Sequence, residues 1–221
     1  MRSLILASAI LFISCLDQKK TRIIFFGDSI TQLGANPGGF IVKIDSMSRL
    51  ENKNDQYEFI GAGVSSNKVY DLYLRMDEDV MAKDPDVVII YIGVNDVWHK
   101  TSSGTGTDAN KFEAFYNAIL KKLKDRSIKV ILCTPAVIGE KYDFTNQQDG
   151  DMNRYANIVR DIAKKNDLPL IDLRKEFLDY SKQNNPDNKE SGILTRDRVH
   201  LNERGNQLVA DLIWKAIKEI K

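Results

Sequence analysis

The sequence predicts a three-layer α/β/α sandwich around a mostly parallel five-stranded sheet. Five short apolar runs alternate with longer segments of helical periodicity, which is typical of consecutive βαβ units. The runs are continuously apolar rather than alternating, as expected for strands that helices cover on both faces. The chain has 221 residues, of which 43% are hydrophobic, and this is enough for one domain with a sizeable core.

The predicted strands are short and rich in Ile, Val, Leu and Phe, which favour extended backbone. In chain order they span residues 23–26, 57–60, 87–92, 128–133 and 168–171. The first of them sets the start of the folded domain, which we predict over residues 21–221. No composition shift or linker indicates a second domain.

Helical periodicity is clearest in three segments, each with its apolar side chains on one face. These faces comprise Phe112, Phe115, Ile119 and Leu123; Tyr155, Val159, Ile162 and Ala163; and Val209, Leu212, Ile213, Ala216, Ile217 and Ile220. Asn202 is a plausible N-cap for the last helix. Residues 41–50 and 69–80 also favour helix, whereas residues 95–108 and 134–150 predict two long loops. Both loops follow strands, so we expect them at the carboxyl edge of the sheet, where such folds bind ligands.

The first 14 residues are predicted to be a secretory signal peptide rather than part of the fold. Arg2 precedes an apolar run over residues 4–13, which is too short to span a bilayer. Cys15 follows a small residue and resembles the lipidated cysteine of bacterial lipoproteins, which would leave residues 15–20 as a tether. The alternative is a plain signal peptide cut nearby, with Cys15 incidental. The expected location is the bacterial cell envelope, or otherwise the periplasm or the medium.

Composition excludes several classes of function. The formal net charge is +1, so no basic surplus indicates nucleic acid, and a membrane is expected only through Cys15. The two histidines and two cysteines are not spaced as zinc ligands, and we expect no metal or cofactor. Cys133 ends an apolar run and is predicted to be a buried, inert thiol. The glycine-rich residues 34–39 lack the Lys-Ser/Thr of a phosphate-binding loop, which argues against nucleotide binding.

Residues that could take part in catalysis follow the predicted strands. Ser29 comes two residues after a strand end, Gly63 follows the second strand, and Asn95 follows the third. Asp197 and His200 precede the last helix, three residues apart. Most of them could instead have a purely structural role, because Ser, Asp, Asn and Gly are also the ordinary residues of caps and turns. The sheet would, however, bring all of them to one edge.

Taken in order, these motifs resemble the four blocks of the SGNH (GDSL) hydrolase superfamily. The blocks here are Gly27-Asp28-Ser29, Gly61-Ala62-Gly63, Gly93-Val94-Asn95-Asp96 and Asp197-Arg198-Val199-His200. The resemblance covers nearly all of the chain after the signal segment and implies a flavodoxin-like sandwich. It maps the family's Ser, Gly, Asn and His onto Ser29, Gly63, Asn95 and His200. Two family positions differ: an Asn is replaced by Gly61 and a Gly by Ser66.

The chemistry of each role can be stated from the residues. A serine hydroxyl attacks an ester only when a base takes its proton, and His200 is the natural base. Asp197 is close enough to accept from the other ring nitrogen and fix the tautomer. The oxyanion that forms needs donors in place, for which the N–H groups of Ser29 and Gly63 and the Asn95 amide are the candidates.

Four more residues are candidates for supporting or pocket roles. Asp28 and Asp96 neighbour the serine and the asparagine, and either could support its loop. Trp98 and His99 could line the pocket or form a solvated loop pair. His99 is also the rival base.

We therefore expect a serine esterase that works through an acyl-enzyme on a small-molecule, glycan or lipid ester. The polar run Thr101–Thr107 favours a short acyl group, as in carbohydrate O-acetylesterases or acetylhydrolases. Lysophospholipases and thioesterases are the alternative, because Trp98, Tyr142 and Phe144 could build apolar walls. A non-catalytic glycan-binding surface protein on the same scaffold is a third hypothesis.

Overall fold

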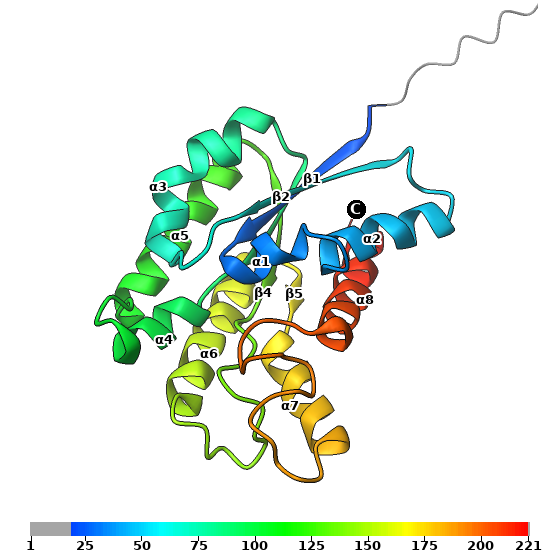
Figure 1. The fold of residues 1–221 in the computed structure, drawn as a ribbon. Helices are drawn as coiled ribbons and strands as arrows, with labels where there is room; N and C mark the ends of the chain where they lie inside the picture. The colour runs from blue at the N-terminus through cyan, green and yellow to red at the C-terminus, as the bar shows by residue number, and fades with distance from the viewer. Residues whose placement is uncertain (1–18, 221) are drawn as a thin grey trace, which may run out of the picture.

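The computed structural model describes residues 19–220 and shows one parallel sheet with the strand order β2-β1-β3-β4-β5 (Figure 1). The predicted signal segment and Cys15 lie outside the described residues. The strands are β1 (Thr21–Gly27), β2 (Tyr57–Gly63), β3 (Val87–Tyr91), β4 (Lys129–Cys133) and β5 (Leu170–Ile171). Every neighbouring pair is parallel, so the prediction of the sheet is confirmed.

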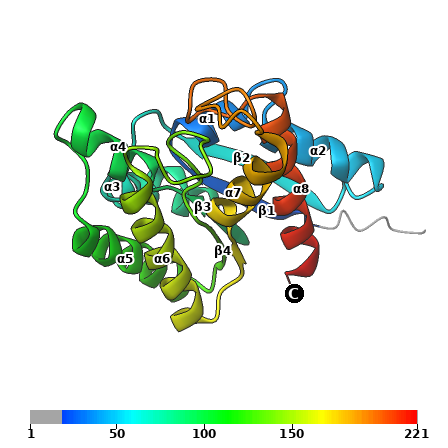
Figure 2. The same ribbon diagram turned by 90° about the horizontal axis from the view of Figure 1, so that it is seen from below.

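Helices cover both faces of this sheet, which confirms the three-layer sandwich. Figures 1 and 2 show α3, α5 and α6 on one face and α2 and α8 on the other. The helices are α1 (Ser29–Gly34), α2 (Phe40–Leu50), α3 (Val69–Asp79), α4 (Val94–Ser102), α5 (Ala109–Asp125), α6 (Asp149–Asn166), α7 (Leu173–Asn184) and α8 (Glu203–Glu219). A short 3₁₀ helix, Met81–Lys83, follows α3.

The core lies between the central strands and the apolar faces of these helices. All five residues of β3 are buried, and so is β1 from Ile23 onward. The predicted helical faces are buried as well, with Phe115, Leu212, Ala216 and Ile220 only partly covered. Cys133 is a buried free thiol, and burial raises its pKa strongly, which fits an inert residue.

The structure differs from the prediction most clearly at two of its helices. Residues 95–102 were expected in a loop, but they belong to α4, whose Val94 and Val97 are buried against the core. The Ser, Thr and Gly residues that follow are typical of loops, which is why this helix was not predicted. A further helix, α7, was not predicted because polar residues dominate it. Leu173, Phe177 and Ser181 form a narrow buried stripe along it.

Strand register brings the candidate residues to one edge. Gly27 pairs with Gly63 in β2 and with Tyr91 in β3, so the segments after these strands begin side by side. The chain between α7 and α8, orange in Figure 2, lies beside α1. Of the helices within residues 19–220, none is long and apolar enough to cross a membrane.

Candidate active site

Ser29 is the first residue of α1 and directly follows the turn at the end of β1. The Asp28 carboxylate caps this helix by accepting from the Ile30 N–H at 2.9 Å. Because Ser29 lies in the first helical turn, its own N–H has no acceptor within the helix. The strand, cap and helix therefore fix a buried serine with a backbone donor available at the same residue.

His200 reaches this serine from the loop before α8. Its Nε2 lies 2.9 Å from Ser29 Oγ, and its Nδ1 lies 2.8 Å from Asp197 Oδ2. The three side chains thus form one hydrogen-bonded series, although 171 residues separate serine and histidine. Asn202 caps α8 by accepting from the Gly205 N–H, as predicted, and this fixes where the loop ends.

A tight turn holds Asp197 against His200. Asp197 Oδ1 accepts from the backbone N–H groups of His200 and Val199, at 2.7 and 3.2 Å. Partial burial works to raise the pKa of Asp197, but these bonds and the His200 ring outweigh it, so the pKa lies below its usual value. The residue is therefore a carboxylate that can accept from the ring nitrogen.

Gly63 lies so close to the serine turn that no side chain fits. A Cβ at this position would lie 2.1 Å from the Gln32 nitrogen and 2.7 Å from the Asp28 oxygen. This close approach, rather than turn conformation, is why glycine is needed. Three residues later, Ser66 has φ +64° at the position where the resembled family often has glycine, so this serine adopts a left-handed conformation that glycine favours.

The Asn95 amide is oriented by the loop after β2. Asn95 lies in the first turn of α4, and its Nδ2 donates to the Asn67 carbonyl oxygen at 3.1 Å. An amide nitrogen carries two hydrogens, so one remains for a ligand. This geometry fits an oriented donor better than an ordinary helix cap, because Gly93 occupies the N-cap position.

Two buried carboxylates support these turns. The Asp96 oxygens accept from the Val69 N–H at 3.2 and 3.3 Å, which joins the starts of α3 and α4. Burial raises the pKa of Asp96 to about 6 and that of Asp28 to about 7, with the neighbouring Asp96 charge adding to the shift at Asp28. Both residues touch backbone groups of the site's scaffold rather than Ser29 or His200 side chains.

Trp98 and His99 are half-buried on α4, with their rings 6.0 Å apart. Trp98 packs against the core. Within residues 19–220 the His99 ring has no hydrogen-bonded or ionic partner, and burial lowers its pKa, with the Lys68 charge adding to the effect. The structure therefore pairs Ser29 with His200 and not with the rival base.

The structure also shows two residues that the sequence did not single out. Arg75 on α3 bonds to the ends of β1 and β2, and Glu140 bonds to the loop before Asp197. The Glu140 carboxylate is buried and accepts from the N–H groups of Ile193, Leu194 and Thr195, at 2.6–2.9 Å. Their partners are backbone groups that are distant in the chain, and no local pattern signals such contacts.

The arrangement provides a hydroxyl, a base hydrogen-bonded to it, a carboxylate hydrogen-bonded to the base, and hydrogen-bond donors nearby. These are the parts of acyl transfer by a serine nucleophile. Across residues 19–220 no three His, Cys, Asp or Glu residues are arranged to hold a metal ion.

Comparison with known proteins identifies the family of the chain. The model of the GDSL-like lipase/acylhydrolase family matches residues 25–208. An acetylxylan esterase of Geobacillus stearothermophilus is 29% identical over 214 residues, covering 89% of this chain and 93% of its own. The uncharacterized lipoprotein YqeF of Bacillus subtilis (strain 168) is 24% identical over 170 residues, covering 69% and 70%. The crystal structure of the acetyl xylan esterase AlAXEase superposes with a TM-score of 0.88 at 60% identity, covering 89% of this chain and 99% of that one.

Proposed function

The chain belongs to the GDSL-like lipase/acylhydrolase family and is a carboxylic ester hydrolase, and we propose that it removes acetyl groups from a carbohydrate. The observation that carries the proposal is the hydrogen-bonded series Ser29–His200–Asp197 in a chain 60% identical to an acetyl xylan esterase. The acetylated glycan is the substrate, and no cofactor takes part.

In the proposed mechanism Ser29 is the nucleophile. Its Oγ attacks the acyl carbon while His200 Nε2, 2.9 Å away, takes the hydroxyl proton. Asp197 accepts from Nδ1, which keeps the tautomer correct and stabilises the imidazolium. His200 then protonates the leaving sugar oxygen, and an acetyl-enzyme remains. Water attacks this ester by the same steps in reverse, releasing acetate and restoring the Ser29 hydroxyl.

The proposed oxyanion site combines donors from three different strand ends. They are the N–H groups of Ser29 and Gly63 and the second Nδ2 hydrogen of Asn95. Two of these are backbone groups on rigid elements, and the third is oriented by the Asn67 carbonyl. Donors that are in place before the charge develops need no reorganisation, which is the main source of such stabilisation.

A pocket with mixed polar and apolar lining beside the histidine turn supports a carbohydrate leaving group. It has a volume of about 560 Å³ and lies between the end of α1 and the start of α8. Arg196 and Leu201, which flank the Asp197–His200 turn, contribute to its lining together with Asn36 and Asn206. Amide and guanidinium groups suit sugar hydroxyls, whereas a long acyl chain would need apolar walls.

A direct test compares ester classes on the wild-type protein. Acetate release from acetylated xylo-oligosaccharides and a p-nitrophenyl ester series from acetyl to palmitoyl should show a maximum at acetyl. The Ser29→Ala variant should release no acetate above background. A maximum at long acyl chains, or preference for a lysophospholipid or thioester, would replace the carbohydrate proposal with a lipolytic one. Glycan binding by a protein that cleaves no ester would favour a binding module.

We further propose that the protein is exported and held at the envelope by lipid on Cys15, after removal of residues 1–14. The apolar run before Cys15 and the similarity to a Bacillus lipoprotein support this. Residues 15–20 would then tether the domain 21–221. Intact-mass analysis of the protein from its native host should find an acylated Cys15 at the N-terminus, and a free thiol there would refute lipidation.

A further inference from the structure

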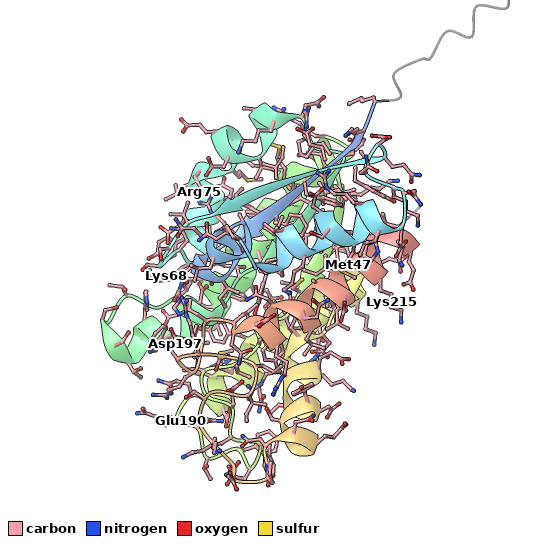
Figure 3. The ribbon with its side chains drawn as sticks, turned by 45° about the vertical axis from the view of Figure 1, so that its right-hand side comes forward. Met47, Lys68, Arg75, Glu190, Asp197 and Lys215 are labelled. Atoms are coloured by element: carbon pink, nitrogen blue, oxygen red, sulfur yellow. The ribbon has the colours of Figure 1, made fainter. Side chains whose placement is uncertain are left out.

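We propose that Arg75 is a positioning residue that sets the geometry of all three oxyanion donors. This inference rests on the proposed function, because it concerns the same site. Arg75 lies on α3, and Figure 3 shows it on the same side of the molecule as Lys68 and Asp197. Its hydrogen bonds go to neither Ser29 nor His200. Its guanidinium instead bonds to the backbone segments from which the donors come.

The first contacts join the carboxyl ends of β1 and β2. Arg75 Nη2 donates to the Gly27 carbonyl at 2.8 Å and to the Ala62 carbonyl at 3.0 Å. Gly27 stands two residues before Ser29, and Ala62 stands directly before Gly63. One nitrogen therefore spans the two strands at the point where they give way to the donor N–H groups.

The next contact reaches the third donor. Arg75 Nε donates to Asn67 Oδ1 at 2.6 Å. The backbone carbonyl of the same Asn67 accepts from Asn95 Nδ2 at 3.1 Å. Asn67 therefore accepts a hydrogen bond from Arg75 through its side chain and orients the Asn95 amide through its backbone carbonyl. Each of the three donors thus lies close to a group that Arg75 contacts. The Ser29 and Gly63 N–H groups are within two residues of such a group, and the Asn95 amide is one hydrogen bond away.

Arg75 itself has little freedom. Its Nη1 bonds to Asp79 one turn later on α3 at 2.6 Å, and the guanidinium lies over the Phe26 ring at 4.7 Å from the centroid. The side chain is 17% exposed. A planar group with five donors can serve four acceptors in different directions, whereas a lysine presents one point charge.

Arg22 offers a matched control at the other end of the same strands. Its Nε bonds to Glu58 at 2.7 Å, and its Nη1 bonds to the Lys83 carbonyl, so it also joins β1 to its surroundings. It lies at the amino edge, remote from the candidate site. If arginines here serve only to stabilise the sheet, substitutions of Arg22 and Arg75 should act alike.

The experiment compares Arg75→Met, Arg75→Lys and Arg22→Met with the wild type on p-nitrophenyl acetate. We expect Arg75→Met to lower kcat about 10- to 100-fold with KM within about twofold, because small displacements of oxyanion donors act on the transition state. Arg75→Lys should be intermediate. Arg22→Met should lower the melting temperature but leave kcat within about twofold. Added methylguanidinium should raise kcat of Arg75→Ala several-fold and leave Arg22→Ala unchanged.

A milder variant covers the case in which Arg75→Met does not fold. Asn67→Ala removes the Nε contact on a half-exposed loop and leaves the strand contacts intact. We expect it to lower kcat about three- to tenfold without a matching loss of stability. A kcat near wild type in both Asn67→Ala and Arg75→Lys would overturn the proposal.

Hydrogen exchange separates this inference from the proposed function, since it does not depend on activity. In Arg75→Met, or in Arg75→Lys, the amides over residues 27–32 and 61–67 should exchange faster than in the wild type, while Arg22→Met leaves them unchanged. If the wild type cleaves no ester but this pattern appears, the proposed function fails and the positioning role stands. Unchanged exchange at both segments overturns the positioning role whatever the activity.

Discussion

The two halves of the candidate site are built differently. The serine half, with Ser29, Gly63 and Asn95, stands on the ends of parallel strands and on the first turns of α1 and α4. The histidine half stands on a loop, and its Asp197 side chain is 46% exposed. Sheet register fixes the first half, whereas the second depends on a few hydrogen bonds, chiefly those of Asp197 and Glu140.

This difference indicates how each half should respond to change. Substitutions in the serine half disturb donors that the sheet holds in place, and the surrounding backbone has little freedom to relax. They should therefore raise the energy of the transition state. Substitutions in the histidine half should act through the orientation of one ring.

The largest effect is expected from Asp197→Asn. The asparagine oxygen can still accept from the Val199 and His200 N–H groups, so the turn should survive. Its amide cannot accept from Nδ1–H, however, so the ring adopts the wrong tautomer, and we expect kcat to fall about 10³-fold. Steady-state kinetics on p-nitrophenyl acetate and a melting curve measure both properties. A loss of kcat below about tenfold would mean that the histidine half contributes less to catalysis than its geometry indicates.

Asn95→Ala should lower kcat about 10²- to 10³-fold with KM nearly unchanged, because it removes one oxyanion donor. The loss of stability should be small, since the amide makes one bond, to the Asn67 carbonyl. Asn117→Ala, which removes an exposed asparagine from α5, is the control and should leave kcat unchanged. A raised KM with kcat unchanged would show that Asn95 instead binds the substrate as strongly in the ground state as in the transition state.

Glu140→Gln should lower stability by about 1–3 kcal/mol, because a glutamine has one acceptor oxygen for three buried N–H groups. We expect kcat to fall about tenfold as the loop before Asp197 loosens. Glu190, labelled in Figure 3, offers the comparison, because its half-exposed ion pair with Arg198 joins the same loop. Glu190→Gln should cost about 0–1 kcal/mol. Chemical denaturation of both variants tests this, and equal losses would contradict it.

Asp28→Asn should change stability in a pH-dependent way and leave the helix cap intact. Burial raises the pKa of Asp28 to about 7, above that of the unfolded chain, so the folded state binds the proton more tightly. Stability therefore falls as pH rises from about 4 to about 7, and asparagine removes this loss. The variant should be about 2–4 kcal/mol more stable than wild type at pH 8 and equal near pH 4. A less stable variant at pH 8 would show that the ionised carboxylate is needed.

The contrast between the halves also explains what the sequence could predict. Continuous apolar runs placed the strands, and Ser29, Gly63 and Asn95 follow strand ends, so their meeting at one edge could be inferred. The bond between Ser29 and His200 could be expected only from the order of the motifs. Arg75 and Glu140 were missed because they bond to backbone groups 13 to 55 residues away, which only the folded chain brings near.

The errors in secondary structure have the same origin. Residues 95–102 are helical because Val94 and Val97 pack into the core, and this contact outweighs the weak helix propensity of the Ser and Thr residues after them. In α7 the buried stripe is narrow, and its cap, Asp172, accepts from the Lys175 N–H. Both helices are stabilised by tertiary packing rather than by local helix propensity.

The central claim is that His200 activates Ser29 for attack on an acyl group. Labelling with a fluorophosphonate probe, followed by peptide mass spectrometry, tests it most directly. We predict one adduct on Ser29 in the wild type, a labelling rate at least about 100-fold lower in His200→Ala, and an unchanged rate in His99→Ala. An adduct on another serine, or equal labelling of Ser29 without His200, would contradict it.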